Sequence, residues 1–201
     1  MNKSKIKLLI FDFDGTLADT KQLYIDAIYK ALGKKGYSVS KGMISEVLGN
    51  RVEAVLSMLK INQKIPEIRK EMNDYVVKRA GDLKSCPFVQ GINRIAGVKI
   101  IVSNSLVSYM MPFIEKQKLK FDGVIGPELS SKQEIFKKLF RKYKVSPKEA
   151  VYIGDRAADV KIAKLAGCKA VAVSNKYSWN SRKEVMKEKP DAIIASLKEL
   201  E

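Results

Sequence analysis

The second half of the chain alternates short apolar runs with amphipathic segments. Five apolar runs have strand length, at Val98–Val102, Gly123–Ile125, Ala150–Ile153, Lys169–Val173 and Ala192–Ile194. Segments with helical spacing lie between them, including Gln133–Tyr143 and Ala157–Ala166, which is followed by Gly167. This alternation predicts right-handed crossovers, and therefore an α/β fold with a doubly wound, mainly parallel sheet.

The first half of the chain has a different pattern. The run Ile6–Phe11 is apolar and predicts a buried strand. Four amphipathic helices are then expected in succession, starting with the stripe Tyr24, Ala27, Ile28 and Ala31 and followed by Lys41–Leu48, a helix with Val52, Val55, Leu56 and Leu59, and a helix after Pro66. Such helices bury their apolar stripes only against one another. We therefore expect a core of residues 1–17 and 87–201, and a small four-helix cap of residues 18–86 inserted after the first strand.

The turn after the first predicted strand contains two acids, Asp12 and Asp14, followed by Gly15. Side chains alternate along extended backbone, so both carboxylates point to the same side while Phe13 points away. Two neighbouring carboxylates repel each other, and their burial lowers stability. Either a bound cation or a reaction that needs one ionised and one protonated carboxyl would explain the pair.

Polar residues also follow two later strands of the predicted sheet. Ser103 and Asn104 come after Val102 and offer a hydroxyl and backbone N–H groups to a phosphate, although such residues are also common helix caps. Asp155 and Asp159 come after Ile153, at the start of a helix. The carboxyl ends of parallel strands meet at one edge of the sheet. Two acids facing the site of Asp12 and Asp14 favour a hard divalent cation, most plausibly Mg²⁺.

The order of acid pair, hydroxyl, lysine and acid pair resembles the four motifs of the haloacid dehalogenase superfamily. Lys132 supplies the lysine between Ser103 and Asp155. The chain is most similar to the branch of phosphoglycolate phosphatase and β-phosphoglucomutase, because the predicted cap follows the first motif and the tail also matches. It departs from that branch after the lysine, where Gln133-Glu134-Ile135 replaces the usual Pro-rich stretch.

The resemblance implies a Mg²⁺-dependent phosphomonoester hydrolase that acts on a small phosphorylated metabolite. Asp12 would attack phosphorus and form an aspartyl-phosphate, and Asp14 would serve as general acid and base. Mg²⁺ would bind the Asp12 carboxylate, the Asp14 backbone carbonyl and Asp155, with Asp159 completing or orienting this set of ligands. Ser103, Asn104 and Lys132 would hold the phosphoryl oxygens. Together these residues make up the predicted catalytic, metal and phosphate sites.

Arg51 lies in Gly49-Asn50-Arg51, between two cap helices, where the branch often places a substrate loop. Its guanidinium is a candidate ligand for a carboxylate or a second phosphate of the substrate. An exposed arginine at a helix start is an equally good interpretation.

Composition excludes several other classes of enzyme. The chain has no histidine, which removes histidine phosphatases, Ser-His-Asp triads and His-ligated zinc. Cys86 and Cys168 form no CxxC pair and are expected to be small buried hydrophobes. The first apolar run is too short and too acidic for a secretion signal, and no stretch is long enough to cross a membrane, so a cytoplasmic monomer or homodimer is expected.

Two alternatives to a hydrolase remain open. A phosphosugar mutase would use the same core to move phosphate between two hydroxyls. The formal charge of +16, from 38 basic and 22 acidic residues, also fits a nucleic-acid-binding protein. Scattered lysines and clustered acids make nucleic acid the less favoured partner.

Overall fold

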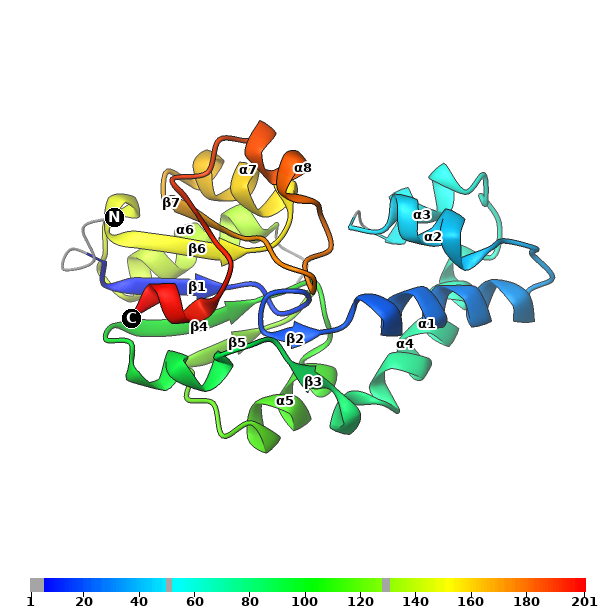
Figure 1. Ribbon diagram of the computed structural model, residues 1–201, viewed down its shortest axis with the longest axis horizontal. Coiled ribbons are helices and arrows are strands. Elements are labelled where there is room, and N and C mark those ends of the chain that lie inside the picture. The colour runs from blue at the N-terminus through cyan, green and yellow to red at the C-terminus, as the bar shows by residue number, and fades with distance from the viewer. Residues whose placement is uncertain (1–5, 50–51, 128–130) are drawn as a thin grey trace.

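The computed structural model describes residues 6–49, 52–127 and 131–201. Strand β1 (Leu8–Phe11) lies inside a six-stranded parallel sheet with the order β5-β4-β1-β6-β7-β8 (Figure 1). The other strands are β4 (Val98–Val102), β5 (Gly123–Ile125), β6 (Ala150–Gly154), β7 (Lys169–Val173) and β8 (Ala192–Ile194). The predicted parallel α/β sheet is confirmed, because every pairing within it is parallel.

Helices cover both faces of the sheet, and the alternation along β1 explains why. Leu8 and Ile10 point to one face, where the helices α6 and α7 pack, while Leu9 and Phe11 point to the other, where α5 packs. All four side chains are buried, so a central parallel strand has no polar face. The core helices are α5 (Val107–Lys116), α6 (Lys132–Lys142), α7 (Ala157–Ala166) and α8 (Arg182–Lys187).

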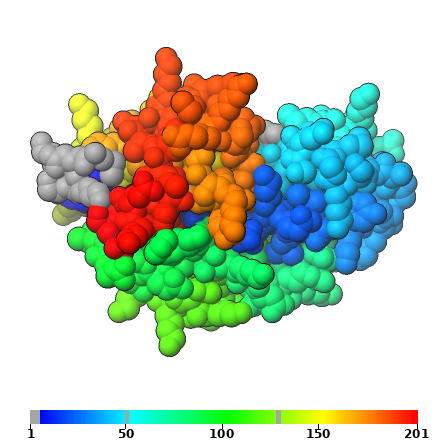
Figure 2. Space-filling view, in the orientation of Figure 1, coloured from blue at the N-terminus to red at the C-terminus, as the bar shows by residue number. Residues whose placement is uncertain are grey.

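Four helices are inserted after β1, as the amphipathic stripes predict. They are α1 (Lys21–Lys34), α2 (Lys41–Val47), α3 (Val52–Met58) and α4 (Ile65–Val77), at the right of Figure 1. A short antiparallel pair of strands, β2 (Ala18–Asp19) and β3 (Lys84–Ser85), joins the two ends of this insert. In the space-filling view the inserted segment forms a lobe beside the sheet (Figure 2). We keep the name cap for residues 18–86, although the exact division of the chain into two domains stays a prediction.

Two details differ from the sequence-based expectation. Helix α6 begins at Lys132, one residue earlier than predicted, because Ser131 and Glu134 form a reciprocal capping box. Between β3 and β4, where the sequence analysis predicts no element, the chain forms a 3₁₀ helix, Val89–Arg94. The other 3₁₀ segments are Ala80–Asp82, Pro147–Glu149 and Leu197–Leu200.

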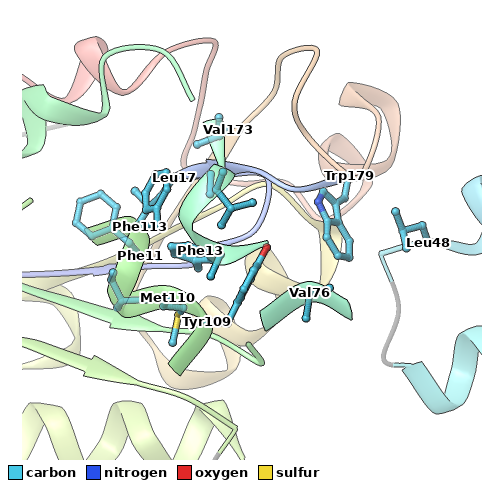
Figure 3. Close-up of a cluster of buried hydrophobic side chains, with 14 of the residues drawn as sticks. Phe11, Phe13, Leu17, Leu48, Val76, Tyr109, Met110, Phe113, Val173 and Trp179 are labelled. Carbon is cyan, nitrogen blue, oxygen red and sulfur yellow. The ribbon is translucent and has the colours of Figure 1, made fainter. Parts of the chain in front are cut away.

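An aromatic cluster anchors the acidic turn that follows β1. Phe13 is fully buried and meets Tyr109 and Phe113 of α5 edge to face, with ring centroids 5.7 and 5.2 Å apart (Figure 3). Each such pair contributes about 0.5–1.5 kcal/mol beyond the area that it buries. Because Phe13 is held in the core, the residues on either side of it, Asp12 and Asp14, are directed away from the core, as the alternation predicts.

The described part of the chain has no helix long and apolar enough to cross a membrane. Cys86 and Cys168 are unpaired and buried, as expected for small hydrophobic side chains.

Candidate active site

The ends of β1 and β6 bring three acids together. The Asp12 backbone N–H donates to the Ile153 carbonyl at 2.8 Å, which places Asp12 directly beside the end of β6. Asp155 follows β6 and Asp159 lies in the first turn of α7. One carboxylate oxygen from each of the three acids lies within 4.8 Å of the others, and all three side chains are buried.

This group of acids fits a hard cation. The Asp12 Oδ1 atom is buried and accepts no hydrogen bond, although the Lys132 ammonium lies 3.2 Å away. Burial raises the pKa of Asp155 well above its usual value, so the folded chain resists its ionisation without a further cation. Oxygen ligands at this spacing suit Mg²⁺, and the donor set therefore matches the ion that the sequence predicts.

Arg156 enters the same cluster, and the sequence analysis did not identify it. Its Nη2 donates to Asp12 Oδ2 at 2.6 Å, and the side chain is buried. The guanidinium also reaches Asp159 at 3.4 Å. The available sequence signal was its position between Asp155 and Asp159, but one arginine among 38 basic residues resembles a surface residue.

Both carboxylate oxygens of Asp159 accept hydrogen bonds from neighbouring residues. Oδ1 accepts from the Tyr152 hydroxyl at 3.1 Å and Lys132 Nζ at 3.4 Å, while Oδ2 accepts from the Arg156 backbone N–H at 3.1 Å. Burial alone would raise the pKa of Asp159, but the charges of Arg156 and Lys132 outweigh it and lower the pKa to about 2. Because both oxygens already have protein partners, this geometry favours the alternative that Asp159 orients the set of metal ligands; its role stays a prediction.

Asp14 lies on the wall of a cleft between the core and the cap. Burial, and secondarily the neighbouring Asp12 charge, raise its pKa to about 6, against the opposing effect of the Ser105 hydrogen bond. The Ser105 hydroxyl donates to Asp14 Oδ2 at 2.5 Å and lies 2.7 Å from the Tyr24 hydroxyl of α1. Asp14 Oδ1 has no hydrogen-bond partner. This carboxyl is therefore oriented, yet one oxygen remains available to exchange a proton.

The predicted phosphate ligands lie around the same cleft. Ser103, Asn104 and Lys132 all line it, and Asn104 is exposed. Ser103 and Asn104 belong to the loop between β4 and α5, while Lys132 is the first residue of α6. Arg51, the predicted specificity residue, lies outside the described residues.

The close approach of two loops in the site depends on Gly15. It has φ of +71°, and a Cβ atom there would lie 2.3 Å from Asp155 Oδ2. We expect Gly15→Ala to lower the free energy of unfolding by about 1–3 kcal/mol, because strained backbone and a displaced Asp155 both cost energy.

Gly33→Ala is the matched control for this prediction, because no atom lies within 4 Å of the added carbon on α1. It should be neutral or stabilising by up to about 1 kcal/mol. Urea unfolding of both variants checks the prediction, and equal stabilities for the two would contradict the packing of Gly15 against Asp155.

Comparisons with known proteins agree with this geometry. The family model of haloacid dehalogenase-like hydrolases matches residues 9–173. The chain is 24% identical over 222 residues to a phosphoglycolate phosphatase of Vibrio parahaemolyticus, and this match covers 100% of this chain and 96% of the relative. It is 25% identical over 211 residues to a phosphoglycolate phosphatase of Synechococcus elongatus, which covers 97% of this chain and 95% of that relative.

Solved structures show the same fold. A haloacid dehalogenase-like hydrolase from Streptococcus pneumoniae superposes with a TM-score of 0.86 at 19% identity, covering 98% of this chain and 97% of the other. The family match spans β1, the whole cap and all of the strand ends at which the acids gather. The chain therefore belongs to the haloacid dehalogenase-like hydrolases.

Proposed function

We propose that the protein hydrolyses phosphate monoesters of small metabolites with Asp12 as the nucleophile. The observation that supports this most strongly is the pairing of two unlike carboxyls. Asp12 presents a buried oxygen that accepts no hydrogen bond, while Asp14 has a pKa raised to about 6. An uncapped carboxylate oxygen that can attack, next to a second carboxyl that can exchange a proton near neutral pH, is the arrangement that nucleophilic attack and proton transfer need.

In this proposal the reaction has two steps. Asp12 attacks phosphorus and an aspartyl-phosphate forms as the bond to the alcohol oxygen breaks. Protonated Asp14 gives its proton to the departing alkoxide, and ionised Asp14 then takes a proton from the water that releases inorganic phosphate. Ser105 holds Asp14 in one orientation for both transfers.

Charge on the phosphoryl group must be offset during both steps. Lys132 lies 3.2 Å from the nucleophile, and Ser103 and Asn104 line the same cleft. We assign these three residues to the phosphoryl oxygens. Mg²⁺, held by Asp12, Asp155 and the Asp14 carbonyl, would supply the remaining positive charge and polarise a phosphoryl oxygen.

Removal of divalent cations tests the metal assignment. Hydrolysis of p-nitrophenyl phosphate should fall at least ~100-fold in EDTA, because the carboxylates then repel the substrate, and should return with Mg²⁺. Mg²⁺ alone should also raise the midpoint of thermal unfolding, since a ligand that binds only the folded chain stabilises it. Full activity in EDTA, with an unchanged midpoint, would contradict the assignment.

The alternatives from the sequence are separated by the same preparation. A phosphosugar mutase would release little phosphate without a bisphosphate activator, whereas the proposed hydrolase releases it directly. A nucleic-acid-binding protein would bind DNA or RNA in a salt-dependent way without turnover. The cytoplasmic location and the monomeric or homodimeric state stay predictions.

A further inference from the structure

A cleft of about 910 Å³ extends to the cap from Lys132 and Arg156, whose side chains contact Asp12 of the acid cluster. Its core end is lined by Asp14, Ser103, Lys132 and Arg156. If this end binds the phosphoryl group, as the proposed function requires, the alcohol half of the substrate extends toward the cap. The side chains on the cap wall therefore indicate what that alcohol is.

The cap wall of the cleft has apolar side chains that are mostly buried, with Val52 half-buried, and it also includes the polar residues Glu53, Arg69 and Asn73. Helix α1 contributes Ile28, α3 contributes Val52 and Val55, and α4 contributes Met72 and Val76. These side chains come from three helices, so the apolar surface is shared by the whole cap. Sugar hydroxyls placed against such a wall would lose hydrogen bonds to water without replacing them.

Aromatic rings continue this surface where the cap meets the core. Tyr24 of α1 meets Trp179 edge to face, with centroids 5.0 Å apart, and Tyr109 lies 6.2 Å from Tyr24. All three rings line the cleft. Figure 3 shows Trp179 on a loop of the core and Leu48 on the cap. Both residues line the cleft. Aromatic rings favour apolar and aromatic ligands over charged ones.

The basic side chains among the described residues of the cleft are already paired. On the cap wall Arg69 forms an ion pair with Glu53. At the core end Lys132 and Arg156 pair with Asp12 and Asp159. Among the described residues of the cleft, no arginine or lysine is left without a carboxylate partner. A substrate carboxylate that bound one of these three described cations would therefore have to compete with an acid of the protein.

Size points to the same conclusion. Pockets of roughly 300–1,000 Å³ hold ligands of drug-like size, so this cleft lies near the upper end. A two-carbon acid such as the glycolate half of phosphoglycolate would leave most of that space to water. A larger apolar group would displace this water from the wall.

Resting on the proposed function, we propose that the substrate is a phosphate monoester of a predominantly apolar alcohol. The phosphate binds at the strand ends, and the alcohol lies against the half-buried side chains of Tyr24 and Val52. The specificity of the site then comes from the area of apolar contact in the cap.

A homologous series of esters tests this inference. We expect kcat/KM to rise about fourfold per methylene from methyl to hexyl phosphate, the gain for burying one such group. 3-Phenylpropyl phosphate should exceed phosphoglycolate at least ~100-fold, the combined effect of several such groups. If kcat/KM does not change with alkyl length, or if phosphoglycolate is the better substrate, the inference is overturned and the proposed function remains. Failure to hydrolyse any ester, with Mg²⁺ present, instead contradicts the proposed function.

A charged substitution in the wall gives an independent test. Val52 is half-buried and lines the cleft, so Val52→Lys places an ammonium among the apolar side chains. The ratio of kcat/KM for 3-phenylpropyl phosphate to that for phosphoglycolate should fall at least ~10-fold, since a buried unpaired charge opposes an apolar ligand. Val77→Lys is the matched control, because Val77 is exposed on α4 and does not line the cleft, and its ratio should equal that of the wild type. An unchanged ratio in a folded Val52→Lys variant overturns the inference. If that variant does not fold, the ester series with the wild-type protein decides the inference instead.

Discussion

Asp12→Asn should abolish phosphate release while the fold survives. An amide oxygen is a poor nucleophile, and loss of a nucleophile in a concerted site costs about 10⁴–10⁶ in kcat. The side chain keeps its shape, and Lys132 and Arg156 retain Asp159 as a partner. Initial rates with p-nitrophenyl phosphate and the far-ultraviolet circular dichroism spectrum measure the two outcomes.

Asp74→Asn is the control for removing one carboxylate from this basic chain. Asp74 lies on the cap helix α4 and pairs with Lys70 at the surface, where such a pair is worth little. Its activity should match that of the wild type. Substantial turnover by Asp12→Asn would rule out the aspartyl-phosphate route, even if other acids of the cluster proved essential.

A second readout separates chemistry from binding. The ester is labelled on its phosphoryl group, and the reaction is quenched with acid. The wild-type protein should then retain the label as an aspartyl-phosphate, whereas Asp12→Asn should retain none. An unlabelled wild type under conditions of full turnover would favour direct attack by water at the same acid cluster.

The parallel sheet could be predicted from sequence because each strand is a predominantly apolar run. The strands β4, β5, β7 and β8 have the predicted ends, and β4 and β5 are bounded on both sides by glycine or polar residues. The pair β2 and β3 was not predicted, since strands of two residues leave no periodic pattern. Their pairing depends on contacts between residues far apart in the sequence, such as Ala18 and Ser85.

The acids of the site were found for a similar reason. Asp12 and Asp155 directly follow predicted strands, so their convergence follows from the parallel sheet. Arg156 and Tyr152 were missed because their contacts appear only in the fold, such as the ion pair of Arg156 with Asp12. Ser105 was missed because a serine near a helix start is ordinarily a cap.

Asp14→Asn should slow turnover and also stabilise the fold. The loss of general acid and base catalysis should cost about 10²–10⁴ in kcat for alkyl phosphates. The loss should be smaller for p-nitrophenyl phosphate, whose phenolate departs without a proton. An equal loss for both esters would show that Asp14 does not protonate the leaving group.

The stability effect of Asp14→Asn follows from the raised pKa of Asp14. Its pKa is 3.8 without the protein environment and about 6 in the folded chain, so the folded state binds the proton more tightly. The resulting stabilisation is complete below a pH of about 4 and is lost as the pH rises through about 6, a change of about 3 kcal/mol by linkage. An asparagine side chain at this position is neutral at every pH and therefore avoids this loss.

We therefore expect Asp14→Asn to be more stable than the wild type by about 2–3 kcal/mol at a pH of about 7.5, with the difference vanishing near a pH of about 4. Thermal unfolding in EDTA at both pH values measures it, and the midpoint at the higher pH should rise by roughly 5–10 °C for a chain of this size. Asp74→Asn should show no such pH-dependent gain, because Asp74 is exposed. A destabilised Asp14→Asn at the higher pH would mean that ionised Asp14 is compensated within the fold. Ionisation of Asp14 would then not lower the free energy of unfolding, and its proton-transfer role would not reduce the stability of the fold.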